Sequence, residues 1–535
     1  MKYTRILTVM ALLWWAGGRS QQLSGSYYAL WQYYQTDTLL HFRAPEGAFR
    51  SMHYLDLHGG SGDWEAGLSA EYYLPQALIG FNPGLKKHFL GWYVRYAHDA
   101  WDLRAGTVYD QTGSGSVFRT WNDKQLGLDN ALRGVDLQYR PGDNTRIKLI
   151  AGNMRTGIDY AESFIGLLNL NQELAFDNFR FRFDATALTR YYTPENDAVP
   201  ANVNLYGLQT GFSYGPWDLS FEYDYKTPDA LYANGVLNDR VLFDGDAYIF
   251  NAGYARKGLG INLTLRRTEN LQMYARRDLQ GNPYNIGTVN YVPALIKQHD
   301  YPLATIYVYS VRQGISFADG TVGEIGGQAD AVFKLKRKTP LGGRYGTIIS
   351  VNASQWNGLN AEFYPQRGIY RRPFWQAGPL YYRDINLEVK RKLSRRWKTA
   401  FFVMHQTYNQ RLLEGHGETV RALTAVTDWT YRIQGATSLR FELEHLWTGQ
   451  DEKNWAAGGL EFNLHGRYGF FLTDMYNYGS TGIHYYNAGL VYTQGGNRLQ
   501  LGYGRQRGGL VCVGGVCRYV PPNKGLQLSV SLSLF

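Results

Sequence analysis

The stretch WDLSFEYDY, residues 217–225, alternates apolar and polar side chains. Because successive side chains of a β-strand point to opposite faces, it predicts a strand with one apolar face and one strongly polar face. The same pattern recurs over residues 259–266, 385–390 and 439–444. A soluble β-sandwich alternates in the same way, so periodicity alone leaves a sandwich and a membrane barrel both open.

The last ten residues, LQLSVSLSLF (526–535), carry the alternation to Phe535. The even positions from 526 to 534 are apolar, and the odd positions between them are Gln or Ser. This segment resembles the closing strand of outer-membrane barrels, which commonly ends in an aromatic residue. In the commonest form of that pattern the terminal aromatic lies in phase with the apolar face, whereas Phe535 falls on the serine face. The segment favours a barrel over a sandwich.

Aromatic residues and glycine are abundant, with 43 Tyr, 25 Phe, 14 Trp and 61 Gly among 535 residues. Only 44% of the residues are hydrophobic, and the mean hydropathy is −0.37. Many strands with tight turns, and aromatic rings at an oil–water boundary, account for this mixture, whereas disordered chains lack aromatics. The formal net charge is +10. Because no Lys/Arg block or nucleic-acid motif accompanies that charge, we expect no nucleic-acid partner.

Residues 1–20 have the composition of a secretory signal peptide. Lys2 and Arg5 precede a short apolar run, and small residues end the segment at Ser20. The apolar run is too short for a membrane-spanning helix. We therefore expect a cleaved signal peptide followed by one outer-membrane β-barrel, residues 21–535, in the bacterial cell outer membrane.

The turns allow the strands to be counted. Both termini of a bacterial barrel lie in the periplasm, so the strand number is even, and short periplasmic turns alternate with longer external loops. Short turn signals occur at 59–63, 98–99, 141–144, 215–217, 256–258, 336–343, 392–396, 434–437, 465–468 and 495–497. The clear strands number about 24, and weaker strands near 156–163 and 286–294 raise the count to about 26, within a range of roughly 20 to 28. We predict an all-β fold, a large single transmembrane antiparallel β-barrel with no plug domain.

A barrel this wide holds water unless something fills it. The stretch 110–134 is long, rich in glycine at its start, and mixes aromatic and charged residues. One hypothesis is an external loop that folds inward and narrows the pore, and an ordinary surface loop packed on itself explains the stretch equally well. The candidate pore-loop residues are Phe118, Arg119, Trp121, Asp123, Lys124 and Arg133.

A second candidate loop covers residues 356–379, where aromatic residues and arginines are interspersed. Such residues can stack on sugars or peptides and pair with anionic groups. A rim loop with membrane-interface aromatics explains the same composition and is favoured. The candidate rim recognition residues are Tyr370, Arg371, Arg372 and Trp375.

Cys512 and Cys517 frame the spacer VGGV and are the only two cysteines of the chain. An exported protein folds in an oxidising compartment, so an even pair favours a disulfide. Two cysteines with no adjacent histidine make a poor metal site. We predict a structural disulfide that contributes about 2–3 kcal/mol.

Signs of catalysis are weak. The 11 histidines are scattered, and neither HExxH nor GxSxG occurs. Glu442, Glu444 and His445 form an acid–histidine cluster of the kind that a large lumen holds by chance. The stretch GSGSVF at 113–118 lacks the Lys-Ser/Thr of a phosphate-binding loop. We expect no enzyme, and hence no catalytic residue, cofactor or metal.

Four stretches of the sequence resemble an outer-membrane barrel family of Bacteroidota that is known as a family of unknown function. They are GSGSVFRTWNDKQLGLDNALRGVDLQYRP (113–141), NYVPALIKQHDYPLA (290–304), TPLGGRYGT (339–347) and RQRGGLVCVGGVCRYVPPNKG (505–525). The resemblance runs over nearly the whole chain after the signal peptide and implies the barrel and its compartment. It implies no catalytic residues. That phylum exports proteins through a type IX system that includes several barrels, and a link to it is by association only.

Two functions follow from these features. The polar inner face predicts a porin-like channel or transport protein for small polar solutes. The elaborate external loops favour, as the alternative, a non-enzymatic structural or assembly partner of a cell-envelope complex such as a secretion or surface-protein system. The expected partners are outer-membrane lipid and, for the alternative, other envelope proteins. An enzyme acting on lipid or glycan ranks last, and the oligomeric state stays open.

Overall fold

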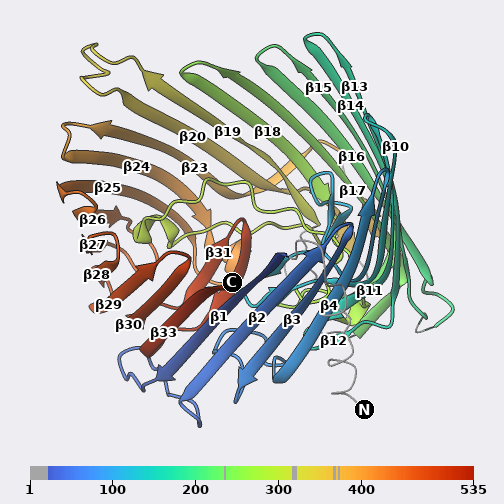
Figure 1. Ribbon diagram of the computed structural model, residues 1–535, viewed down its shortest axis with the longest axis horizontal. Coiled ribbons are helices and arrows are strands. Elements are labelled where there is room, and N and C mark those ends of the chain that lie inside the picture. The colour runs from blue at the N-terminus through green and yellow to red at the C-terminus, as the bar shows by residue number, and fades with distance from the viewer. Residues whose placement is uncertain (1–21, 195, 234–235, 316–321, 365–368, 372–373) are drawn as a thin grey trace.

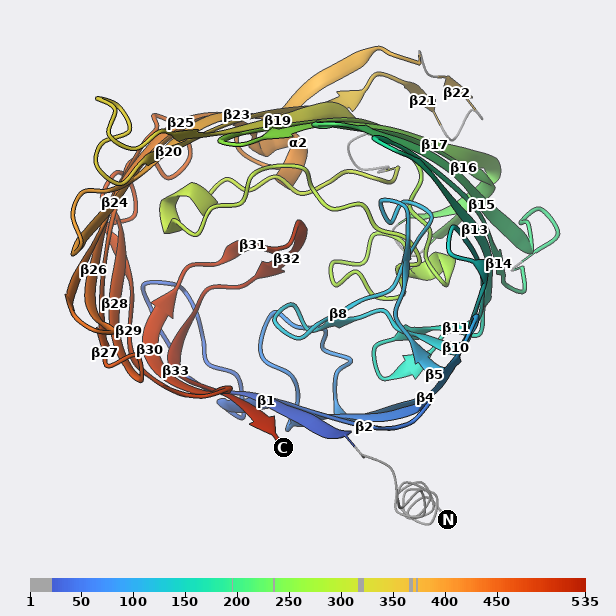
Figure 2. The same ribbon diagram turned by 45° about the horizontal axis from the view of Figure 1, so that its top comes forward.

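The chain forms one closed antiparallel β-barrel (Figures 1 and 2). The computed structural model describes residues 22–535 except 195, 234–235, 316–321, 365–368 and 372–373. The predicted signal peptide, residues 1–20, therefore lies outside the described residues. The barrel closes where β1 (Gln22–Tyr34) pairs with β33 (Asn523–Leu534), in a register that runs from Gly25 opposite Leu534 to Tyr34 opposite Gly525. The predicted closing strand is thus confirmed, with Phe535 one residue beyond it.

The wall of the barrel contains 24 strands. The others, in order, are β2 (Phe49–Ser61), β3 (Trp64–Leu74), β4 (Lys87–His98), β5 (Trp101–Val108), β10 (Leu132–Gly142), β11 (Thr145–Thr156), β13 (Phe164–Phe176), β14 (Phe179–Tyr191), β15 (Asn202–Tyr214), β16 (Trp217–Ala233), β17 (Val236–Arg256), β18 (Leu259–Glu269), β19 (Gly323–Leu335), β20 (Thr347–Leu359), β23 (Ala377–Lys392), β24 (Trp397–Asn409), β25 (Thr419–Gln434), β26 (Thr437–Trp447), β27 (Trp455–Leu464), β28 (Tyr468–Asn477), β29 (Ile483–Gln494) and β30 (Asn497–Gln506).

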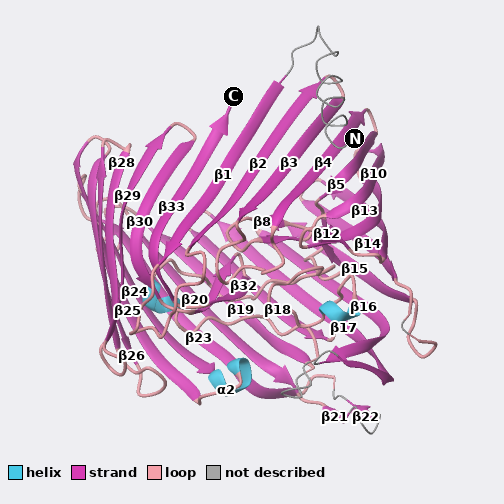
Figure 3. Cartoon of the chain, turned by 90° about the horizontal axis from the view of Figure 1, so that it is seen from below, coloured by secondary structure: helices cyan, strands magenta, loops and turns pink. Residues whose placement is uncertain are grey.

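Short elements lie in the loops. They are β6 (Gln111–Thr112), β7 (Phe118–Arg119), β8 (Asn122–Asp123), β9 (Leu128–Asp129), β12 (Asp159–Tyr160), β21 (Glu362–Tyr364), β22 (Ile369–Arg371), β31 (Gly509–Val513), β32 (Val516–Val520), the 3-10 helices η1 (Arg277–Leu279) and η2 (Pro302–Thr305), and the helix α2 (Gln410–Glu414). Figure 3 shows the helices confined to the connections between strands. Within the described ranges, no helix is both long enough and apolar enough to cross a membrane.

The two faces of the wall differ as the alternation predicts. On β16, Trp217 and Phe221 are 51% and 45% exposed on the outside, whereas Glu222 and Asp224, in the opposite phase, are buried in the interior. An outward apolar band and a polar inner face are the arrangement of barrels that cross the outer membrane. A soluble sandwich would present its polar face to solvent, so the structure decides between the two alternatives.

The connections also divide as predicted. Every short turn quoted above joins two wall strands at the end of the barrel that carries both termini, and the long loops leave from the opposite end. We call these the turn end and the loop end. By the usual orientation of bacterial barrels, the turn end faces the periplasm.

The strand count of about 26 exceeds the observed wall by two, although 24 lies inside the stated range. Of the two weak strands, 156–163 yields only the two-residue β12, which pairs with β11. The other, 286–294, is no strand and belongs to the connection between β18 and β19. Its apolar residues Val289, Tyr291 and Val292 are buried against other loops, and such packing imitates the alternation of a strand.

Candidate functional site in the lumen

Loops of the chain itself occupy the interior of the barrel. Several connections from the loop end turn inward, and the three longest of them are 109–131, the described part of 270–322, and 507–522 (Figure 2). The shorter connection 75–86 also turns inward and buries Phe81 and Leu85. Among the described residues these connections form no separate globular domain, in agreement with the prediction of a barrel without a plug domain. The lumen and these three lumen loops are the candidate functional site.

The first lumen loop, 109–131, contains most of the candidate pore-loop residues and is attached to the wall by polar contacts. The backbone N–H of Ser114 and the hydroxyl of Ser116 both donate to the Glu222 carboxylate on β16, at 3.1 and 2.7 Å. Across the lumen, Lys124 forms an ion pair with Asp56 on β2. The loop is therefore attached to the wall on two sides of the lumen, and that it narrows a pore stays a prediction.

The other candidate pore-loop residues pack within the lumen. The Phe118 ring is fully buried in an apolar cluster with Met273 and Val289 of the second lumen loop. The Arg119 guanidinium lies 4.9 Å from the centre of the Trp121 ring, and Trp121 packs on Tyr291 with ring centres 5.5 Å apart. The first two lumen loops thus form one packed unit.

The two remaining candidate pore-loop residues, Asp123 and Arg133, have different roles. Asp123 accepts hydrogen bonds from the backbone N–H groups of Gln125 and Leu126, which shapes the loop rather than a binding surface. Arg133 lies on β10, where its guanidinium is 3.9 Å from the centre of the Tyr160 ring. The six candidate pore-loop residues therefore comprise five residues of the first lumen loop and one residue of the wall, Arg133.

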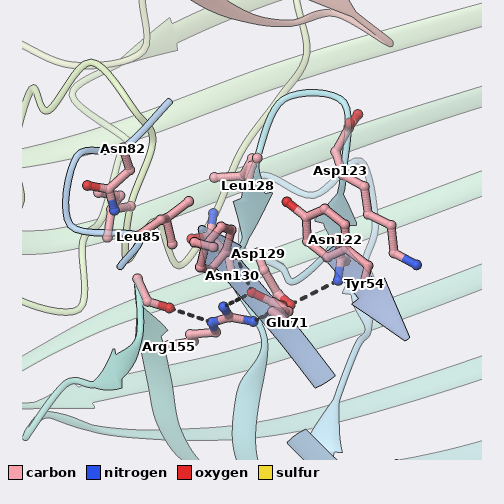
Figure 4. Close-up of a pocket in the computed structure, with 15 residues that line it drawn as sticks. Tyr54, Glu71, Asn82, Leu85, Asn122, Asp123, Leu128, Asp129, Asn130 and Arg155 are labelled. Atoms are coloured by element: carbon pink, nitrogen blue, oxygen red, sulfur yellow. Dashed lines mark hydrogen bonds and ion pairs between the residues drawn. The ribbon is translucent and has the colours of Figure 1, made fainter. Parts of the chain in front are cut away.

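A buried ion-pair network fixes the base of the first lumen loop. Arg155 on β11 contacts Glu71 on β3 at 2.6 Å and Asp129 of the loop at 2.7 Å (Figure 4). Asn122 also donates to Asp129, at 2.9 Å. Since buried charges are costly unless paired, these contacts act together to hold the loop in a single position.

The second lumen loop, 270–322, is held by a comparable cluster. Asp229 on β16 contacts Arg190 on β14 and Arg277 on η1, each at 2.7 Å. Arg277 also donates to the Pro200 carbonyl at 2.6 Å. Further along, Arg266 on β18 forms a fully buried ion pair with Glu324 at 2.7 Å and donates to the Pro293 carbonyl at 2.8 Å.

The same loop then crosses toward strands β23–β26. The Tyr301 hydroxyl donates to Glu388 at 2.9 Å, and the Leu303 backbone N–H donates to Glu444 at 2.9 Å. Tyr301 packs with Phe402, Met404 and Val426 in a small apolar cluster. Glu444, which the sequence places in a chance acid–histidine cluster, thus serves here as an anchor for the loop.

His299 sits beside these anchors, and its imidazole lies 4.3 Å from the Phe402 ring, centre to centre. Its Nε2 is buried and has no hydrogen-bond partner among the residues that the structure describes. Burial lowers the pKa of His299 to about 4, with Lys297 and Lys390 acting in the same direction and Glu388 opposing them. The docked loop therefore requires a neutral imidazole.

We expect acid to loosen this part of the loop. Because the pKa of His299 is depressed in the docked state, docking is fully stable above the ordinary pKa of about 6.5 and weakens as the pH falls toward 4, by roughly 3 kcal/mol at that limit. Hydrogen–deuterium exchange over residues 295–307, corrected for intrinsic rates, should show protection falling between pH 7 and 4.5. His299→Phe keeps an aromatic ring against Phe402 and should remove that fall, and equal losses in both proteins would count against a role for His299.

The third lumen loop contains the hairpin β31–β32, which is cross-linked by the Cys512–Cys517 disulfide. The predicted disulfide is thus confirmed. Gly515 at the hairpin tip accepts hydrogen bonds from the Tyr291 hydroxyl and the Ala294 backbone N–H, both at 3.2 Å. A side chain at Gly515 would meet Pro293, and its φ of +80° also favours glycine there. The hairpin therefore closes against the second lumen loop.

The candidate rim recognition residues have different surroundings in the structure. Tyr370 packs on Phe243 with ring centres 5.1 Å apart and donates to Glu269, so it joins the hairpin β21–β22 to the wall. Arg371 is exposed, and Trp375 is 65% exposed at the loop end. Arg372 lies outside the described residues. Figure 2 shows β21 and β22 outside the barrel wall.

The sequence patterns do not reveal that the second lumen loop fills the barrel. The available signal was length, because 77 residues (259–335) separate the short turn signals at 256–258 and 336–343. That is far more than one pair of spanning strands requires. The sequence patterns also do not reveal the cluster of lysines and arginines at the turn end, since these residues come from separate strands.

The chain is similar to several solved structures at low identity. The translocation pore of the P pilus usher PapC gives a TM-score of 0.45 at 10% identity, covering 96% of this chain and 100% of that chain. The siderophore receptor PirA from Pseudomonas aeruginosa gives 0.42 at 9%, covering 97% and 81%. OccK3 (OpdO) from Pseudomonas aeruginosa gives 0.38 at 10%, covering 96% of each chain.

No curated protein matches the sequence. The match to a protein family, in contrast, extends over residues 1–534. It agrees with the sequence-based resemblance to a family of unknown function. The chain belongs to the family of unknown function DUF6029.

Proposed function

We propose that this protein is an outer-membrane channel for small polar solutes whose passage is controlled by its own lumen loops. The observation that carries the proposal is the construction of the lumen. Its wall is polar, and its filling consists of loops attached by discrete ion pairs and hydrogen bonds. A wide barrel with a polar interior conducts water and solutes unless it is filled, so the position of the filling sets the conductance.

The attachment of the loops supports control rather than permanent closure. Each lumen loop begins and ends at the loop end, so it can move without disturbing the strand pairing of the wall. Its anchors are charged side chains, whose pairing responds to solvent and pH. Apolar clusters also join the loops to the wall, so the charged anchors are the part of the attachment that pH can change.

The direct test is single-channel recording with the full-length protein in planar bilayers. We expect discrete current steps that are small for a barrel of this width, because the loops occupy part of the lumen. Detergent buffer without protein should give no steps. Stable insertion without any steps over the accessible voltages would refute the proposal. The alternative of an assembly partner stays a prediction, to be tested by co-purification from native membranes.

A further inference from the structure

A cavity of about 600 Å³ opens at the turn end of the barrel, beneath residues 297–301 of the second lumen loop. Its walls come from the turn-end parts of β19, β20 and β23–β26. Tyr301 and its hydrogen-bond partner Glu388 both belong to the lining. We call this cavity the basic vestibule.

The lining of the basic vestibule is strongly cationic. It contains five lysines and three arginines against three carboxylates. The cations are Lys297, Lys334, Lys390, Lys392, Lys398, Arg337, Arg391 and Arg440, and the carboxylates are Asp300, Glu388 and Asp428. An excess of one sign of charge in a hollow with low-dielectric walls concentrates ions of the opposite sign.

Three of these cations already have carboxylate partners. Lys297 pairs with Asp330 at 3.1 Å, Lys390 with Glu388 at 2.8 Å, and Arg440 with Asp428 at 2.6 Å. The remaining five form no ion pair with any residue that the structure describes. They are Lys334, Arg337, Arg391, Lys392 and Lys398. A group of unpaired cations around one hollow lacks a structural counter-ion and favours an external one.

The register of the strands separates the lysines of β23 and β24 from lipid. On β23, Lys390 and Lys392 are in phase with the buried Asp384 and Glu388, while Arg391 is in phase with the outward Leu387. On β24, Lys398 is in phase with Phe402, which packs under Tyr301. Side chains in phase with the interior point into the lumen. The vestibule is therefore placed to meet solutes in the lumen rather than lipid headgroups.

We propose that the basic vestibule binds small polyanionic solutes that carry phosphoryl or carboxylate groups. The lysines supply point charges, and Arg337 can form a bidentate contact with one planar or tetrahedral anion. The Thr399 and Thr430 hydroxyls and the Tyr345 ring complete the lining. A volume of about 600 Å³ falls within the usual range for small-molecule sites.

Pyrophosphate binding to the full-length barrel in detergent, measured by isothermal titration calorimetry, tests this proposal. The triple variant Lys334→Gln, Arg337→Gln and Lys398→Gln should weaken binding about tenfold or more, because it removes three of the unpaired charges. All three residues are exposed, so folding should be unaffected. The matched control Lys86→Gln, Lys257→Gln and Lys336→Gln removes three exposed lysines outside the lining and should bind like the wild type.

Equal weakening in the control, or no pyrophosphate binding by the wild type, would overturn the assignment. A second arm repeats the titration in nanodiscs with and without phosphatidylglycerol. Unchanged affinity supports a solute site, and competition by the anionic lipid would assign the site to a headgroup instead. Calorimetry does not require an open channel, so pyrophosphate binding to the basic vestibule can be measured even if the barrel does not conduct.

Discussion

Replacing residues 272–320 with a short Gly-Ser linker is expected to raise the single-channel conductance about five- to tenfold, because an unfilled barrel of this size is an aqueous channel. The deletion is compatible with the wall, since Glu269 at the end of β18 already pairs with Gly323 at the start of β19. The removed segment includes the anchors Arg277, Tyr301 and Leu303. Single-channel recording in planar bilayers gives the comparison.

The matched control deletes residues 361–376, which include the hairpin β21–β22 outside the wall (Figure 2). This variant should conduct like the full-length protein. If the two deletions raise the conductance equally, or if the first leaves it unchanged, the second lumen loop does not control passage.

The substitution Asp229→Ala should destabilise the docked second lumen loop by about 3–5 kcal/mol, the usual cost of removing one partner of a buried ion pair. The side chains of Arg190 and Arg277 are 2% and 1% exposed, and both would lose the carboxylate that they share. Limited proteolysis of the folded barrel should then cleave near η1 under conditions that leave the wild type intact. Urea unfolding in detergent gives the free energy.

The control is Asp218→Ala on the same strand. Its ion pair with Arg182 has nearly the same length, 2.8 Å, but the two side chains are 56% and 43% exposed. Exposed pairs contribute about 0–1 kcal/mol, so this variant should resemble the wild type. A similar sensitivity of both variants to protease would show that burial of the Asp229 cluster does not hold the loop.

The wall of the barrel was predictable because each strand encodes its own faces. Trp217 and Phe221 face outward on β16 for the same local reason that Glu222 faces inward. The turns were predictable because Gly, Pro, Asn and Asp mark tight reversals, and Gly215 with a φ of +53° is one such case. These signals need only neighbouring residues.

The lumen was less predictable because its contacts join distant parts of the chain. Residues 113–118 and Glu222 meet across more than 100 positions, and no local pattern announces that meeting. Tyr291 and Val292 are buried by other loops. Their segment therefore has the apolar composition of a strand, although it is not a strand of the wall. The basic vestibule combines the ends of several strands, so its charge is dispersed in the sequence.

The pairing of β1 with β33 is required to close the barrel. Every wall strand pairs antiparallel with its neighbours, so β30 and β1 run in the same direction. A chain that lacks β33 cannot seal into a smaller barrel of the same type, because its two free edges have matching rather than opposed polarity. Such a fragment keeps two unpaired edges that invite aggregation or degradation. Loss of the last strand alone therefore leaves the antiparallel wall unclosed.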